Sequence, residues 1–254
     1  YFDARLDWKR SFGDHNLTAM AMYMMREYRS DVLPNRNQGY SGRVTYDYAS
    51  KYLVEFNFGY NGSERLAAGQ RFEFFPAVSA GWVASSEKFW EPISKYINHF
   101  KIRGSYGLVG SDDFASGAPH FLYQNNIGIG SAHKFWTGLP TSEISKQGPG
   151  FYVLAVQDAG WEHVKKFDIG FDMMLFNQLN ITFDYFHDKR ERILMSRASW
   201  PSMLGYWGSK PWSNIGEVEN QGFELSLNWT KQFGKDLTLD LRGNFTYNQN
   251  EYKY

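Results

Sequence analysis

The sequence lacks cysteine entirely, which excludes disulfide bonds and thiolate metal sites from its 254 residues. It also lacks a long apolar run, so it predicts no membrane-spanning helix. Net charge is missing as well, because 27 Lys and Arg balance 27 Asp and Glu. This balance gives no indication of nucleic acid or of an anionic surface as a partner.

Aromatic residues, by contrast, are abundant and make up 19% of the chain. The length suits one large all-β domain or two ordinary domains. The chain begins at Tyr1 and ends at Tyr254 within an alternating stretch. We therefore expect it to be a piece of a longer protein.

Apolar and polar residues alternate strictly in the stretch LNITFDYFHDKR, residues 179–190. A period of two predicts a β-strand with one apolar and one polar face. Its apolar register consists of Leu179, Ile181, Phe183 and Tyr185. Its polar register consists of Asn180, Thr182, Asp184 and Asp188, with Phe186 as an aromatic exception that we expect to pack against a plug inside the barrel or against a loop.

The same alternation predicts nine further strands along the chain. They lie at residues 2–9, 17–25, 40–48, 52–60, 78–82, 100–106, 167–175, 223–229 and 237–245. Short links alternate with long ones, which places all tight turns at one end of the strands. The long links are expected at about residues 61–76, 110–160 and 195–217, with a shorter one near 30–38.

This alternation of links predicts an all-β fold, an antiparallel transmembrane β-barrel with short periplasmic turns and long extracellular loops. One link departs from the rule, because residues 85–98 lie at the short-turn end yet can hold a helical turn or two. Charges on the apolar registers occur only near strand ends, as at Arg10, Glu27, Arg29 and Lys165. Tyr and Trp also gather near strand ends, as expected of aromatic girdles.

Two other classes remain open on the residues alone. A soluble β-sandwich that binds carbohydrate through Trp-rich loops would show the same two-faced strands. A passive porin or an outer-membrane adhesin would share the barrel. Nothing in the sequence indicates catalysis, a cofactor or a metal site, because the six His form no metal-ligand spacing.

Candidate binding residues lie in the expected long loops. Asp112 and Asp113 suit either half of a cation site or a solvated loop tip, and the loop tip is the favoured interpretation. Exposed aromatic rings suit sugar or peptide recognition, although long loops also need small cores of their own. The aromatic candidates for substrate or lipoprotein contact are Tyr123, Trp136, Trp200, Trp207 and Trp212.

The polar registers predict the residues that face the lumen of the barrel. The candidates are Arg43, Asp168, Asp172, Asp184 and Glu224. Acids outnumber bases on these registers only mildly, which argues against an anion-selective path.

Several stretches resemble the SusC-like branch of the TonB-dependent outer-membrane transporters of Bacteroidetes. They include LPNRNQGYSGRVTYDY, KIRGSYGLVGSDD, the FPAVSAGW run at residues 75–82 and GEVENQGFE at residues 216–224. The similarity runs in order over most of residues 30–250 and is weakest in residues 111–160. The resemblance also accounts for residues 85–98, since the family has a lengthened periplasmic connection there.

The resemblance implies a 22-stranded barrel with an N-terminal plug, in the cell outer membrane. Residues 1–254 would be part of that single barrel domain and supply about ten strands, with the plug and the closing strands absent from this chain. A SusD-like surface lipoprotein would capture oligosaccharide or peptide cargo, and TonB would act through the plug to admit it. A dimer of such transporter–lipoprotein pairs is also implied as an option, and the family offers no catalytic residues.

Overall fold

The structure is a computed structural model that describes residues 1–29, 34–114, 118–137, 144–197, 199, 201, 203 and 210–253, with the backbone alone at 129–135 and 144. Ten strands form one antiparallel sheet in the order β1-β2-β3-β4-β5-β6-β9-β10-β11-β12. These strands are β1 (Phe2–Phe12), β2 (His15–Arg29), β3 (Pro34–Tyr48), β4 (Tyr52–Ser63), β5 (Phe72–Val83), β6 (Ile97–Ser111), β9 (Glu162–Leu175), β10 (Leu179–Ser196), β11 (Trp212–Phe233) and β12 (Leu237–Tyr252).

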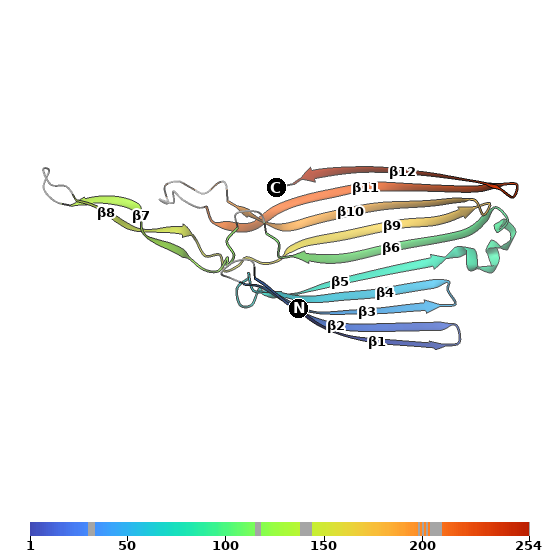
Figure 1. Ribbon diagram of the computed structural model, residues 1–254, viewed down its shortest axis with the longest axis horizontal. Helices are drawn as coiled ribbons and strands as arrows, with labels where there is room; N and C mark the ends of the chain where they lie inside the picture. Colours follow the sequence, from blue (N-terminus) through green and yellow to red (C-terminus); the bar gives the residue numbers. More distant parts are fainter. Residues whose placement is uncertain are drawn as a thin grey trace.

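A second sheet consists of a hairpin within the connection between β6 and β9. Its strands are β7 (Asn126–Thr137) and β8 (Ile144–Val153), which pair with each other. Figure 1 shows the ten strands as a single curved layer, with the hairpin projecting beyond one end. Among the described residues no second sheet packs face to face on the ten-stranded one, so the β-sandwich alternative is wrong.

The tight turns lie at one end of the sheet and the long links at the other, as predicted, with the predicted exception of the β5–β6 link (Figure 1). The β3–β4 link comprises residues 49–51 and has positive φ at Ala49 and Ser50, a geometry that suits the twist of antiparallel strands. The β9–β10 turn has the same geometry at Phe176 and Asn177, one residue earlier than expected. The long link between β5 and β6 at the short-turn end contains two 3-10 segments, η1 (Ala84–Ser86) and η2 (Lys88–Ile93).

The two registers of each strand give the sheet an apolar face and a polar face, named here after β10. The apolar face carries Ile181 and Phe183, and the polar face carries Asp184. Rings on the apolar face form a row across five strands, with centroids 5.6 to 6.1 Å apart. This aromatic row consists of Phe100, Phe171, Phe183, Phe223 and Phe245.

Tyrosine and other rings gather at both ends of the apolar face. Near the short turns, the His15 Nδ1 lies 2.8 Å from the Tyr46 hydroxyl, and the same ring lies 4.9 Å from the Tyr48 ring. Near the long links, the Tyr23 and Tyr40 rings lie 4.9 Å apart. Cross-strand ring pairs of this kind stabilise sheets. The predicted girdles are therefore present at both ends of the strands.

Most strands extend beyond the predicted ranges at the long-link end. β11 begins at Trp212, within the expected 195–217 loop, and β5 begins at Phe72 within the expected 61–76 loop. The hairpin β7–β8 lies within the expected 110–160 loop. Alternation is lost in these segments because both faces there meet loops or solvent, which removes the need for one apolar register.

A small hydrophobic core lies at the long-link end of the sheet. Leu66, Leu122 and Leu194 are fully buried there, together with Trp161. The remaining members are Phe75, Phe114, Val156 and Ala159. These residues come from two connections and two strands, so the core fixes the β4–β5 and β6–β9 connections against β5 and β10. Over the described residues, no helix has the length and apolar character needed to cross a bilayer.

Candidate functional site

Arg103 on β6 is the centre of a charged cluster on the polar face. Its Nη2 lies 2.7 Å from the Asp184 carboxylate, and its Nε donates to Asp172 Oδ2 at 3.3 Å. Its Nη1 lies 3.5 Å from Asp168 Oδ1. Thr182 donates a further hydrogen bond to Asp172 Oδ1 at 3.2 Å. One guanidinium therefore serves three carboxylates from β9 and β10, and charge-assisted hydrogen bonds of this kind are the strong ones.

Gly170 makes this cluster possible. Gly170 pairs with Arg103 on one side and with Asp184 on the other, so it separates the two charged residues in the sheet. A Cβ at position 170 would overlap the Asp184 carboxylate and the Phe183 carbonyl oxygen. The missing side chain lets Arg103 reach across β9 to a residue two strands away.

Glu224 on β11 stands directly opposite Asp184 and extends the acidic side of the cluster. Arg43 belongs to a separate polar group on β3 and β4, where its Nε donates to Asn57 Oδ1 at 2.9 Å and lies 3.7 Å from Glu55 Oε1. The sequence prediction placed both residues on the polar register, and the structure places them on that face.

A hollow of about 480 Å³ lies between these two groups on the polar face. Ser79, Gly81 and Ser105 provide its small floor side chains, while Glu55 and Arg103 line opposite sides. Small residues on β5 and β6 leave this space, and the charged side chains make it hydrophilic. The arrangement can hold water, a polar ligand or a polar protein surface, and it contains no nucleophile–base pair among the described residues.

Asp112 and Asp113 follow β6 at the long-link end. Asp112 Oδ2 accepts a hydrogen bond of 2.8 Å from the Asn37 side chain, and its backbone oxygen accepts one of 3.0 Å from Arg65. Asp113 is exposed, and its backbone N–H donates to Ser111 Oγ at 3.2 Å. Asp112 thus ties β6 to β3 and to the β4–β5 link. In the part of the chain that the structure describes, no cluster of three or more His, Asp or Glu could hold a metal ion.

The predicted loop aromatics fall into two groups in the structure. Trp212 packs against the buried core, and the Tyr123 ring lies 5.7 Å from the Phe121 ring with the Arg71 guanidinium 5.9 Å away. Trp136 lies on β7 in the projecting hairpin and is 61% exposed. Trp212 therefore has a structural role, and Trp136 remains a candidate contact. Trp200 and Trp207 lie outside the described residues.

Phe186, the aromatic exception on the polar register, covers a glycine of the neighbouring strand. It stands opposite Gly222 on β11, where an added Cβ would lie 2.8 Å from its ring. Among the described residues this contact lies within the sheet, and packing of Phe186 against the plug or a loop stays a prediction. An aromatic ring over a strand glycine restores the contact that the missing side chain would have made.

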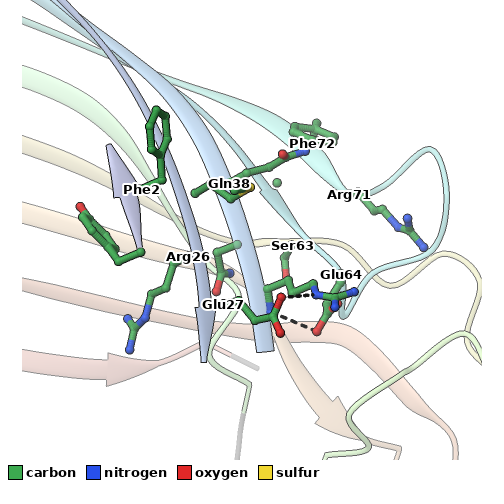
Figure 2. A pocket seen from close by; sticks show the side chains of 13 residues that line it. Phe2, Arg26, Glu27, Gln38, Ser63, Glu64, Arg71 and Phe72 are labelled. Atoms are coloured by element: carbon green, nitrogen blue, oxygen red, sulfur yellow. Dashed lines mark hydrogen bonds and ion pairs between the residues drawn. The ribbon is translucent and has the colours of Figure 1, made fainter. Parts of the chain in front are cut away.

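Sequence reasoning missed a second hollow, of about 600 Å³, at the long-link end of β1–β5. Figure 2 shows Phe2, Glu27 and Phe72 beside it, and Arg36 also lines the hollow. Arg36 Nε lies 3.1 Å from Glu27 Oε2, and the Arg36 N–H donates to Glu64 Oε1 at 3.0 Å. The sequence feature that could have indicated this hollow was the charged Glu27, which interrupts the apolar register of its strand.

A third feature without a clear sequence signal is the group around Glu73, which joins β5 to β9 and β10. His163 Nε2 lies 2.8 Å from Glu73 Oε1, and Arg192 Nη1 lies 3.8 Å from the same oxygen. Nearby, the buried Glu162 accepts a hydrogen bond of 3.1 Å from the Leu194 N–H. These contacts hold the core end of the sheet together.

The ten-stranded sheet is a single layer with a charged face, an apolar face and links of two lengths. The sequence model of the family described as "TonB dependent receptor-like, beta-barrel" matches residues 1–254, the whole chain. The chain belongs to this family. The family comprises outer-membrane β-barrels and not enzymes, and in such barrels the outward band is apolar and the interior is polar. The short turns then lie on the periplasmic side.

Curated relatives agree with this assignment. TonB-dependent receptor P3 of Formosa agariphila is 31% identical over 211 residues, which cover 83% of this chain and 20% of the relative. TonB-dependent receptor SusC of Bacteroides thetaiotaomicron is 26% identical over 232 residues, which cover 89% of this chain and 22% of SusC. The chain spans about a fifth of the length of these relatives.

Solved structures show the same fold. The RagAB peptide importer in its 'open-open' state superposes with a TM-score of 0.79 at 19% identity, covering 99% of this chain and 29% of that chain. The siderophore receptor PirA from Pseudomonas aeruginosa superposes with a TM-score of 0.57 at 12% identity, covering 98% of this chain and 43% of that chain. At these identities the likeness concerns the fold alone.

Proposed function

We propose that this chain is part of the barrel of a SusC-like importer that carries oligomers across the outer membrane. The observation that carries the proposal is the Arg103 cluster on the lumen-facing side of a single strand layer. A charged, hydrophilic face backed by an apolar one suits the wall of a water-filled passage. The mildly acidic character of this face suits neutral or cationic cargo better than phosphate-rich cargo.

We propose that residues 1–254 belong to one barrel domain, and that the plug and the closing strands lie elsewhere in the protein. The plug would contact the lumen face near the 480 Å³ hollow and would transmit the pull of TonB. The hollow supports this proposal because its small floor residues leave room for a polar surface.

The partner at the cell surface would be a SusD-like lipoprotein, and the β7–β8 hairpin is the proposed contact. Ile127 and Trp136 on this hairpin are both more than half exposed. The hairpin projects from the long-link end, which is the extracellular side in this family (Figure 1). Exposed aromatic rings such as that of Trp136 are typical anchors of protein interfaces. A dimer of two transporter–lipoprotein pairs is compatible with this arrangement.

The cargo is proposed to be a glycan or peptide oligomer. The name of the RagAB structure refers to a peptide importer, and the relative SusC is named as a TonB-dependent receptor, which supports import in general. The charge of the lumen face distinguishes between these two classes of cargo, because three carboxylates surround the single guanidinium in the Arg103 cluster. A cationic peptide would gain attraction there, whereas a neutral glycan would depend on hydrogen bonds.

The test uses the full-length transporter with an affinity tag, produced in its native host and purified in detergent. Mass spectrometry identifies any lipoprotein and any oligomer that co-purify. A variant in which residues 126–153 are replaced by a short Gly-Ser linker is purified in parallel. The hairpin pairs only with itself in the described sheets, so we expect this variant to keep its barrel and to lose the lipoprotein.

Uptake of the identified oligomer by cells is then measured before and after an uncoupler collapses the proton-motive force. We expect uptake to stop, because TonB depends on that force. Uptake that continues unchanged would support a passive porin and would contradict the proposal. Purification of the intact protein without any lipoprotein would contradict the proposed partner.

A further inference from the structure

The connection between β5 and β6, residues 84–98, exposes an unusual number of large apolar side chains at the periplasmic end. Phe89 and Tyr96 are each 62% exposed, and Ile93 is 41% exposed. Phe176, in the adjacent β9–β10 turn, is 57% exposed, and its ring lies 6.1 Å from the Tyr96 ring. Aromatic and branched side chains grouped in this way indicate a surface that something covers.

This connection is held firmly at both ends. At its start, Glu87 Oε1 accepts a hydrogen bond of 2.8 Å from the Tyr52 hydroxyl, and Glu87 Oε2 one of 3.1 Å from Lys51 Nζ. At its end, the Tyr96 carbonyl oxygen accepts a bond of 2.9 Å from the Phe176 N–H. Asn98 Oδ1 accepts one of 2.6 Å from the Asn177 N–H. The exposed rings therefore have fixed positions along the periplasmic edge.

The connection lies on the apolar side of the sheet. The Phe89 ring is 6.3 Å from the ring of Trp82, which belongs to the apolar register of β5. The Trp90 ring stacks on Phe100 with centroids 5.3 Å apart and planes inclined by 8°. Phe100 is the first member of the aromatic row, so the rings of the connection continue the lipid-facing surface without interruption.

We propose that residues 84–98 form a membrane anchor that lies in the periplasmic leaflet of the outer membrane, with phospholipid as its partner. Phe89, Ile93 and Tyr96 insert at the level where acyl chains meet headgroups. Tyr and Trp favour this level because one end of the ring is apolar and the other is wet. Lys88 and Lys95 are exposed and lie on the same short segment, so their stems follow the apolar surface while their ammonium groups meet lipid phosphates.

Two observations favour lipid over a periplasmic protein as the occupant. The patch is continuous with the lipid-facing surface through Trp82, Trp90 and Phe100, and a soluble partner would have to share that surface with lipid. In addition, an apolar groove of about 390 Å³ begins beside the connection, lined by Tyr52, Trp82, Ile102 and Ile169 over the floor residues Ala80 and Gly104. An acyl chain can fill such a groove on a membrane-facing surface.

The test places single nitroxide labels in the full-length transporter, reconstituted in vesicles of phosphatidylethanolamine and phosphatidylglycerol. Because residues 1–254 contain no cysteine, Phe89→Cys and Tyr96→Cys each introduce one labelling site in this region. Asp14→Cys and Asp236→Cys, in two other short turns, are matched controls at the same end of the sheet. Collision rates with oxygen, which concentrates in lipid, and with a water-soluble nickel chelate report the depth of each label.

We expect the oxygen-to-nickel ratio to be several-fold higher at positions 89 and 96 than at 14 and 236. Equal ratios at all four positions would place the connection in water and overturn the proposal. Unboiled samples that migrate as folded barrels in electrophoresis confirm that each labelled variant is folded. If the Phe89→Cys variant does not fold, Ile93→Cys replaces it as the second test position. Its oxygen-to-nickel ratio is then compared with those at positions 14 and 236 in the same way.

Discussion

Arg103 on β6 and Asp184 on β10 are in contact across a complete intervening strand. The Arg103 Nη2 lies 2.7 Å from the Asp184 carboxylate although 81 residues separate the two in sequence. The contact exists because Gly170, between them on β9, has no side chain. The charged cluster on the polar face therefore depends on a glycine that carries no charge itself.

Gly170→Ala should destabilise the barrel by about 1–3 kcal/mol, because the added methyl group would overlap the Asp184 carboxylate and the Phe183 carbonyl oxygen. Gly104→Ala on β6 is the matched control. The nearest atom to a Cβ at position 104 is the Asp168 carbonyl oxygen at 3.6 Å, an ordinary contact distance. Guanidinium unfolding of the full-length protein in detergent compares the two, and equal losses would contradict the role assigned to Gly170.

Arg103→Met should destabilise the protein by about 1–2 kcal/mol, because three carboxylates lose the guanidinium that they share. The side chains of Arg103 and its three carboxylate partners are about a third exposed or less, so solvent screens part of their electrostatic attraction and reduces the loss. Adding Asp184→Asn should recover part of the stability by removing one negative charge. Arg43→Met serves as the control, since Arg43 is 55% exposed and its ion pair with Glu55 is longer. Unfolding midpoints at low and high salt provide the measurement.

Trp136→Ala should weaken binding of the surface lipoprotein about tenfold, the effect expected when an exposed aromatic anchor is truncated. The free energy of unfolding should stay unchanged, because Trp136 is 61% exposed. Affinity measured by biolayer interferometry on the purified transporter tests the first part. Unchanged affinity would remove Trp136 from the interface.

Trp212→Ala should lower stability rather than lipoprotein binding, because Trp212 packs against the buried core at the extracellular end. The free energy of unfolding should fall by about 1–3 kcal/mol for a partly buried ring. The β6–β9 connection, which this core fixes in place, should be cleaved faster by added protease. Cleavage at the wild-type rate would show that the connection does not depend on Trp212.

Stability should also depend on the charge of Glu87. Hydrogen bonds from the Tyr52 hydroxyl and from Lys51 lower the pKa of Glu87 in the folded protein. A lowered pKa means that the contribution is fully present above the ordinary pKa of a glutamate and is lost as pH falls through the lower folded value. We expect the thermal unfolding midpoint of wild type to drop more steeply than that of Glu87→Gln as pH falls below 5. Parallel curves would exclude this role for Glu87.

The local sequence determined which residues form strands and which side chains lie on the apolar and the polar face. In residues 179–190 the strict alternation requires a strand, because a period of two aligns every second side chain on one face. The alternation of short turns and long links then decided which face meets lipid. The 3-10 turns of residues 84–93 were also foreseeable, since that link was too long for a simple turn.

Other features could not be read from local patterns. The extracellular ends of β5 and β11 are strands without alternation, because they pair with neighbours above the level where one face must be apolar. The β7–β8 hairpin lies in a segment with irregular register, where bulges interrupt the pattern. Likewise, Trp136 and Trp212 look equivalent in sequence, and only their positions relative to the buried core separate an exposed ring from a structural one.

Each side chain's face was thus encoded locally, because backbone geometry alone sets the direction of successive side chains. Which charges meet was decided by the register between strands far apart in sequence. Arg103, Gly170, Asp184 and Glu224 form one row across β6, β9, β10 and β11 only after those strands pair. A slip of one residue would turn the charged side chains toward lipid, where an Arg or Lys costs about 2–4 kcal/mol at the bilayer centre and an Asp or Glu costs less. The free-energy cost of that slip selects the register and, with it, the charged site.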